Sequence, residues 1–380
     1  MRKCLLIVLG LCTLLAGCTV SPQEDHPSLS YELDHLDTKG IFDSTDSVEV
    51  LDSKSDKVLL SISKRYQEGD DYAVEQGYNS YTTRVVQYSL RDNEIVSEYT
   101  VSPGTFCADG VLLDNGFDLI EVDISSRNEG AYTYNVCRIQ SNREILKSDL
   151  CSSFVGAPTM VSLGDNNTAY NFYNPITKEF GVCIIHSDGR ISDSIRYVES
   201  ADHTPLGSKL EGNGQCYLYY MGLDSRGTLL VGDNEKVIGQ AQLGQSERMY
   251  SYTLLQDSIL MSTIDQSSTS NKDELMGTVS VRNFEGKILQ STEHLPLYKL
   301  TSDGISTAIG VNSKQQVEHI AVYEKGIRTY AVPEYANNTE YFLYPFSISE
   351  NEFGVLEWKG SSTGIAQLKF TSGSDKGEIA

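Results

Sequence analysis

The chain has 380 residues, of which 52 are acidic and 30 are basic, so its formal net charge is −22 at pH 7. Such an acidic surface argues against electrostatic binding of nucleic acid or of anionic lipid head groups. The length is large for a single compact core and indicates either two domains or one toroidal repeat fold.

The N-terminus has the organisation of a bacterial secretion signal. Two basic residues precede a short apolar run at 5–15, which ends in Leu15-Ala16-Gly17-Cys18. The run is shorter than the roughly 20 apolar residues that span a bilayer. The last four residues resemble the lipobox of bacterial lipoproteins, and the resemblance covers residues 1–18 only. It implies a signal peptide at 1–17 and lipidation of Cys18, which would place the protein on the extracytoplasmic face of the cell membrane. The alternatives are a signal peptide cut elsewhere or an uncleaved anchor.

Residues 18–30 are expected to hold the lipidated cysteine and a polar tether, and residues 31–380 a β-propeller domain. From residue 31 onward the chain repeats a strand, a tight polar turn and another strand, without a sustained helical period. Seven such turns are centred near residues 92, 142, 188, 234, 285, 325 and 362. Their spacing of about 45 residues is typical of β-propeller blades. The sequence therefore predicts an all-β propeller of about seven four-stranded blades, with two tandem β-sandwiches as the alternative.

Two details of this repeat remain open at the level of sequence. The fourth turn could equally be placed at Asp224-Ser225-Arg226-Gly227. The last blade is expected to borrow a strand from the N-terminal side, because closing the ring protects strand edges. Val48-Glu49-Val50-Leu51 is the candidate for that strand.

Five cysteines follow Cys18, and an odd number leaves at least one unpaired within a monomer. They are Cys107, Cys137, Cys151, Cys183 and Cys216. Buried thiols are the first expectation, because free cysteine behaves as a small apolar residue, and one disulfide is possible. No Cys/His spacing of a zinc site occurs, so neither a metal site nor a cofactor is predicted.

Two short motifs are interpreted as turns. Gly360-Ser361-Ser362-Thr363-Gly364 matches G-x-S-x-G, but a nucleophile elbow needs a helix after it. Residues 365–370 alternate like a strand instead, which indicates a hairpin. Ser187-Asp188-Gly189 resembles a turn of sialidase-like propellers. The intervening residue and the following aromatic of that motif are missing, so the turn is interpreted as structural and no sialidase activity is inferred.

Tyrosines in two loops are the candidate ligand-binding residues. The loop near 65–82 contains Tyr72, Tyr78 and Tyr81, and the corresponding loop of the third blade contains Tyr173. Both loops should leave the face opposite the tight hairpins. Exposed aromatic rings there would suit stacking on a sugar or gripping a peptide. The alternative is that these rings only pack their own loops.

Two functions remain open. The first is a lipid-anchored extracytoplasmic binding or scaffold protein whose ligand is a glycan, a peptide or a protein partner. The alternative is a cell-surface propeller enzyme, such as a glycosidase or lyase, that uses carboxylates. Acidic residues are so numerous that no pair is singled out as catalytic, and the fold alone decides neither function.

Overall fold

The computed structural model describes residues 30–38, 40–43, 46–65, 81–102, 104–128, 131–141, 143–152, 158–206, 209–265, 276–359 and 362–371. Their regular elements are strands, apart from one 3-10 turn at Pro333–Tyr335. No helix among these residues is long and apolar enough to cross a membrane. The chain divides into two compact units, of which one is residues 32–369 and the other combines Met1–Tyr31 with Phe370–Ala380.

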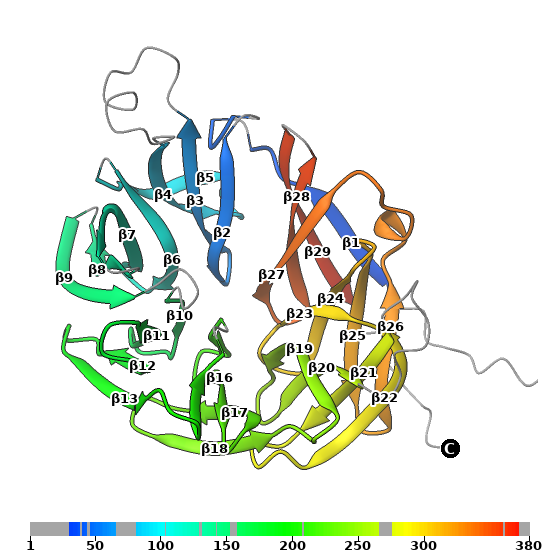
Figure 1. The fold of residues 1–380 in the computed structure, drawn as a ribbon. Helices are drawn as coiled ribbons and strands as arrows, with labels where there is room; N and C mark the ends of the chain where they lie inside the picture. The colour runs from blue at the N-terminus through cyan, green and yellow to red at the C-terminus, as the bar shows by residue number, and fades with distance from the viewer. Residues whose placement is uncertain are drawn as a thin grey trace, which may run out of the picture. The chain divides into compact units, whose positions relative to one another are not determined.

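Seven antiparallel sheets stand around a central space, as Figure 1 shows for the larger unit. Blade 1 contains β2 (Ser47–Lys54), β3 (Lys57–Arg65), β4 (Tyr81–Ser89) and β5 (Glu94–Thr100). Blade 2 contains β6 (Thr105–Leu113), β7 (Gly116–Asn128), β8 (Ala131–Gln140) and β9 (Arg143–Ser152). Blade 3 contains β10 (Met160–Ser162), β11 (Thr168–Asn174), β12 (Glu179–Ile185) and β13 (Ile191–Val198).

The remaining blades follow the same plan, and only blade 4 has a divided first strand. Blade 4 contains β14 (His203–Pro205), β15 (Glu211–Gly212), β16 (Tyr217–Leu223), β17 (Arg226–Gly232) and β18 (Val237–Gln242). Blade 5 contains β19 (Glu247–Leu254), β20 (Ile259–Asp265), β21 (Met276–Arg282) and β22 (Ile288–Pro296). Blade 6 contains β23 (Tyr298–Ser302), β24 (Thr307–Asn312), β25 (Val317–Tyr323) and β26 (Gly326–Ala331). Blade 7 contains β27 (Phe342–Ser349), β28 (Glu352–Lys359), β29 (Ser362–Thr371) and β1 (Ser30–His35). The predicted fold class is confirmed.

The core of the ring lies between successive blades. Each apolar cluster combines side chains from two neighbouring sheets; for example, Phe346 of blade 7 packs with Leu60 of blade 1. The innermost strands contact one another in turn, and β27 contacts β2. A sheet covered on both faces reads as a run of apolar residues, whereas the outer strands alternate.

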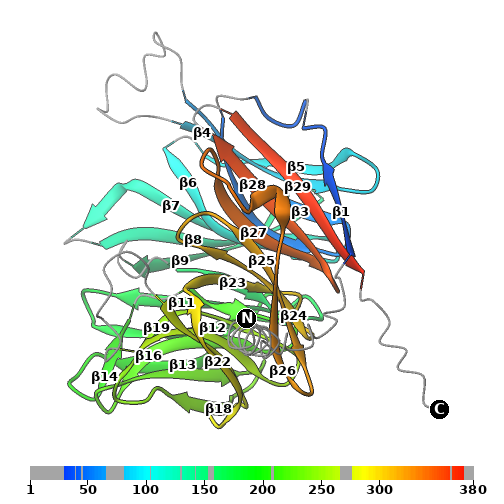
Figure 2. The same cartoon turned by 90° about the vertical axis from the view of Figure 1, so that its right-hand side faces the viewer.

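A strand from the N-terminal side closes blade 7. Figure 2 shows the blue β1 beside the red β29, in the order β27-β28-β29-β1. The borrowed strand was expected, but the choice of residues 48–51 was wrong, because they lie in β2, the innermost strand of blade 1. The physical reason is burial. An innermost strand is packed and therefore apolar, whereas most of β1 is exposed and so carries little apolar signal.

Six of the seven predicted turns join the third and fourth strands of their blades. The fourth lies at 233–236, between β17 and β18, whereas 224–225 joins β16 to β17. The seventh differs, because β28 and β29 are the second and third strands of blade 7. Their pairing extends to Lys359 and Ser362, so the G-x-S-x-G match is a hairpin, as predicted.

The ring has two faces that the strand directions define. We call the face with the third-to-fourth turns of blades 1–6 the hairpin face, and the opposite one the loop face. Innermost strands run from the loop face to the hairpin face. The strand β29 runs the same way, because it follows a second-to-third turn. The backbone N–H of Leu36 donates to the carbonyl of Ile365, so β1 runs antiparallel to β29 and Glu32 lies toward the hairpin face.

The smaller unit has contacts between its two chain segments. Ser30 Oγ donates to Thr371 Oγ1 at 3.2 Å, and the rings of Tyr31 and Phe370 have centroids 5.8 Å apart.

The expectation of buried thiols holds for three cysteines, which are Cys107, Cys137 and Cys183. Cys216 is a partly buried free thiol. Cys151 lies in β9, at a position whose side chain is outside the described set.

Candidate functional site

A cavity of about 1560 Å³ lies along the centre of the ring, between the innermost strands of all seven blades. Its lining is strongly acidic. The acidic lining residues are Asp43, Asp46, Glu49, Asp52, Asp109, Glu211 and Asp303. The basic ones are Lys54 and Lys209. We refer to this cavity as the central channel, and it is the candidate functional site.

Two of the carboxylates connect successive blades. The backbone N–H of Leu112 in blade 2 donates to Asp52 Oδ2 of blade 1 at 2.7 Å. The N–H of Met160 in blade 3 donates to Asp109 Oδ2 of blade 2 at 2.9 Å. An innermost strand has a free edge, and its N–H groups need partners. These hydrogen bonds therefore stabilise the ring and also hold both carboxylates in fixed positions.

The same device recurs with hydroxyl groups elsewhere around the channel. Thr159 Oγ1 accepts from the N–H of Leu210 at 2.8 Å and so joins blade 3 to blade 4. Ser251 Oγ accepts from the N–H of Leu300 at 3.0 Å and joins blade 5 to blade 6. Part of the polarity of the channel wall is thus a requirement of the fold rather than of a ligand.

The channel carboxylates have raised pKa values. Burial raises the pKa of Asp109 to about 6, although the ammonium of Lys209 opposes the change. Burial also raises the pKa of Asp52 to about 6, and the charge of Asp109 adds to it. Burial raises the pKa of Glu211 to about 7, the ammonium of Lys209 opposes the change, and the charge of Asp109 adds to it. Burial raises the pKa of Glu49 as well. Walls on all sides remove most of the bulk water that would stabilise a carboxylate.

Lys209 lines the channel just before β15, where the first strand of blade 4 is interrupted between β14 and β15. Its side chain touches solvent inside the cavity, and the surrounding walls remove most of the bulk water. That burial acts to lower the pKa of Lys209. The charges of Glu211, Asp109 and Asp52 outweigh it, so the pKa of Lys209 rises above its usual value. The channel therefore stabilises an ammonium group.

Three exposed aromatic side chains lie at the loop-face end of blade 7. We call Phe342, Tyr344 and Trp358 the aromatic face; they are 58%, 47% and 45% exposed. Phe342 pairs with Trp358 across β27 and β28, and their ring centroids are 6.0 Å apart. Tyr344 and Trp358 also line the central channel. The aromatic face and the acidic wall thus border one cavity.

The predicted binding tyrosines are not part of this cavity's described lining. Tyr72 and Tyr78 lie outside the described residues, and Tyr81 begins β4 at a position whose side chain is not described. Tyr173 is the penultimate residue of β11, toward the loop face, and its hydroxyl donates to Glu199 Oε2 at 3.0 Å. Their role in binding stays a prediction, as does lipidation of Cys18, which also lies outside the described residues.

Sequence reasoning missed both the channel carboxylates and the aromatic face. A signal for some of them exists in the chain. Asp52 and Asp109 each stand within an apolar strand, where a charge is costly unless it has a partner. The single tryptophan, Trp358, lies in a strand whose preceding residues are buried. These signals identify unusual positions, but they do not indicate that the positions meet in one cavity.

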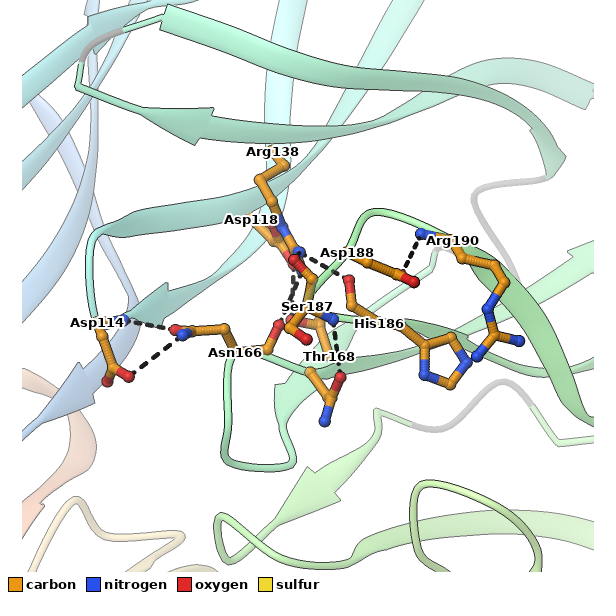
Figure 3. A network of polar contacts seen from close by, with 10 residues as sticks. Asp114, Asp118, Arg138, Asn166, Thr168, His186, Ser187, Asp188 and Arg190 are labelled. Atoms are coloured by element: carbon orange, nitrogen blue, oxygen red, sulfur yellow. Dashed lines mark hydrogen bonds and ion pairs between the residues drawn. The ribbon is translucent and has the colours of Figure 1, made fainter.

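A second polar cluster is buried between blades 2 and 3 (Figure 3). Arg138 forms an ion pair with Asp118, and its Nη1 donates to the carbonyl of His186 at 2.8 Å. Thr168 Oγ1 donates to Asp118 Oδ2 at 2.7 Å. The turn at 186–190 therefore holds Arg138 in place through its backbone carbonyls. This agrees with the interpretation of the turn as structural. This cluster contributes to packing of the blades and lies apart from the channel lining.

Comparison with known proteins supports the fold and nothing finer. No protein-family model matches the sequence, and no curated protein does. The structure is similar to the Dos1 propeller, with a TM-score of 0.51 and 11% identity over 89% of this chain and 95% of that chain. It is also similar to a chain of the mitotic checkpoint complex, with a TM-score of 0.50 and 9% identity over 90% and 95% of the two chains. A weaker likeness is to the propeller domain of the trilobed protease from Pyrococcus furiosus, with a TM-score of 0.43 and 10% identity over 87% and 82%.

At such identities the likeness shows the fold alone. The chain is a seven-bladed β-propeller. Among its described residues, no group of His, Cys, Asp and Glu side chains is arranged to hold a metal ion.

Proposed function

We propose that this chain is an extracytoplasmic binding or scaffold protein, anchored by a lipid on Cys18, that binds a peptide, glycan or protein partner at the loop-face end of the central channel. The observation that carries the proposal is the aromatic face beside a cavity of about 1560 Å³. Contiguous exposed apolar side chains mark interaction sites more often than scattered ones do. Concave sites that combine aromatic and a few polar groups are the usual form of a binding site.

The direction of β1 bears on which face of the ring a lipid anchor would leave open to a partner. The chain enters this strand from the end near Glu32, which lies toward the hairpin face. Residues 19–29 could extend to at most ~40 Å. A lipid on Cys18 would then attach the protein from the hairpin-face side of blade 7. The loop face, with the aromatic face on it, would be available to a partner.

Metabolic labelling with an alkyne fatty acid tests the anchor. Wild-type protein should carry the label and sediment with membranes, whereas Cys18→Ala should be unlabelled and unprocessed. Cys216→Ala is the matched control and should behave as wild type, because Cys216 lies within the folded domain. Normal labelling of Cys18→Ala would overturn the lipoprotein proposal.

An array screen tests the binding site. Protein comprising residues 19–380 is applied to glycans and to peptides that span acidic, neutral and basic sequences. The double variant Tyr344→Ala/Trp358→Ala should lose at least about tenfold in affinity for any ligand of this site. Tyr323→Ala is the control, because Tyr323 is 42% exposed but lies on the hairpin face. Equal loss in both variants, or in neither, would contradict binding at the aromatic face.

A carboxylate enzyme is the second candidate, and the pKa of Glu211 favours it. A carboxyl with a pKa of about 7 can act as a general acid near neutral pH. Glu211→Gln should then abolish turnover of a glycan that still binds. Binding without any turnover in the wild-type protein would leave the binding function alone.

A further inference from the structure

One face of blade 7 is covered at one end and open at the other. Phe346 and Ile348 of β27 are buried against blade 1. Phe342 and Tyr344 follow the same alternation on that strand, yet about half of each side chain is exposed. Trp358 extends this open area onto β28. A sheet face that its neighbouring blade covers elsewhere is therefore uncovered at the loop face, beside the mouth of the central channel.

The charge beside this open area favours a cationic occupant. Tyr344 and Trp358 line the same cavity as the carboxylates of Glu49, Asp52, Asp109 and Glu211. Lys209 is one of the two basic lining residues of the described channel. The other, Lys54, ends β2 at the hairpin face and pairs with Asp114 at 3.0 Å. The described lining therefore contains seven acidic side chains and two basic ones, which leaves an excess of negative charge that would repel an acidic ligand and attract a basic one.

Aromatic rings next to carboxylates suit the side chain of Lys or Arg. Such a side chain can place its charge near the acids and its methylene groups or guanidinium plane on a ring. The protein contains one such arrangement, in which Lys359 Nζ lies 5.3 Å from the ring centroid of Tyr341 on the same blade. The aromatic face also extends outside the channel, over Phe342. A small free amine would leave that outer part uncovered, whereas the apolar flank of a peptide would cover it.

We infer that the aromatic face and the channel mouth bind a basic peptide segment of a protein partner, with a Lys or Arg side chain entering the channel and apolar flanking residues lying on Trp358 and Tyr344. This inference rests on the proposed binding function and names its ligand class.

Tryptophan fluorescence provides a direct readout, because Trp358 is the only tryptophan in the sequence. The probe is the peptide acetyl-LRLKL-amide, compared with acetyl-LELEL-amide and with spermidine. The basic peptide should shift the emission of wild-type protein saturably, and raising NaCl from 20 to 300 mM should weaken its binding, because part of the attraction is electrostatic. The acidic peptide should bind at least about tenfold more weakly.

Two variants separate the contributions of rings and charges. Tyr344→Ala should lower the affinity for the basic peptide about three- to tenfold. The double variant Glu49→Gln/Glu211→Gln should lower this affinity by a similar factor and should also remove most of its salt dependence. Tyr323→Ala and Glu235→Gln, exposed on the hairpin face, should leave affinity unchanged. Melting curves of each variant confirm that it folds.

Each contrary result has a distinct meaning. Equal binding of the acidic peptide, or spermidine binding as tightly as the basic peptide and unaffected by Tyr344→Ala, would overturn the inference. An array ligand that needs Tyr344 and Trp358 but is acidic or neutral would overturn it while leaving the proposed function in place. Failure of every array ligand at this site would remove both.

Discussion

Arg138 of β8 and Asp118 of β7 form a two-pronged ion pair inside the contact between blades 2 and 3. Nε lies 2.7 Å from Oδ1 and Nη2 lies 2.8 Å from Oδ2, and both side chains are fully buried. Nη2 also donates to the carbonyl of Asn166 in blade 3 at 3.0 Å. The guanidinium thus satisfies backbone acceptors of blade 3, while Asp118 of blade 2 balances its charge.

Breaking this pair should destabilise the whole propeller. Arg138→Met leaves Asp118 buried without its counter-charge and should lower the free energy of unfolding by about 3–5 kcal/mol. The double variant Arg138→Met/Asp118→Leu should recover part of that loss. Urea denaturation measures both. Arg196→Met is the control, because its pair with Asp193 is about half exposed and should contribute about 0–1 kcal/mol. A loss for Arg138→Met as small as the control's would contradict the role assigned to the pair.

Acid should destabilise the protein partly through His319. This histidine is buried on β25, and burial lowers its pKa to about 4. The unfolded chain therefore binds a proton near pH 6.5 that the folded chain does not bind until about pH 4, so stability falls as pH falls through this window. The contribution is of order 3 kcal/mol. His319→Gln should reduce the difference in unfolding free energy between pH 7 and pH 4.5. An unchanged difference would show that His319 has no part in the acid sensitivity.

Glu211 should have the opposite pH dependence. Its pKa of about 7 is raised, so between about pH 4.5 and 7 the folded protein holds a proton that the unfolded chain releases. Its contribution therefore falls as pH rises through that window. Glu211→Gln should stabilise the protein by about 1–2 kcal/mol at pH 8, and the gain should vanish at pH 4.5. Melting temperatures at both pH values test this. Destabilisation at pH 8 would show that attraction between Glu211 and Lys209 exceeds the cost of burying the carboxylate.

Removing the closing strand should affect the whole ring. A chain that starts at residue 37 lacks β1 and exposes the edge of β29, so we expect lower stability and self-association through that edge. Removing residues 341–380 deletes the rest of blade 7 and should abolish cooperative folding. Circular dichroism and gel filtration measure both, with a chain that starts at residue 30 as the control. A monomeric, cooperatively melting product without residues 341–380 would contradict closure of the ring by this blade.

The sequence by itself determined the blade number and the hairpins, because both depend on local chemistry. Clusters of Asp, Asn, Ser and Gly mark tight turns, because these residues tolerate the backbone conformations that such turns need. Apolar runs between the clusters mark strands that are packed on both faces. The sequence did not determine which strand closes the ring. β1 lies on the exposed outer edge and therefore lacks an apolar pattern, and its partner β29 is more than 300 residues away.

The candidate site was decided only by the tertiary structure. Asp52, Asp109 and Glu211 come from three different blades, and nothing in the sequence indicates that they meet. Closing the ring places them around Lys209 and removes their water, which is what raises their pKa values. Likewise, the sequence does not indicate that Trp358 is left exposed beside blade 1. Long-range packing therefore created both the charge of the channel and the exposure of the aromatic face.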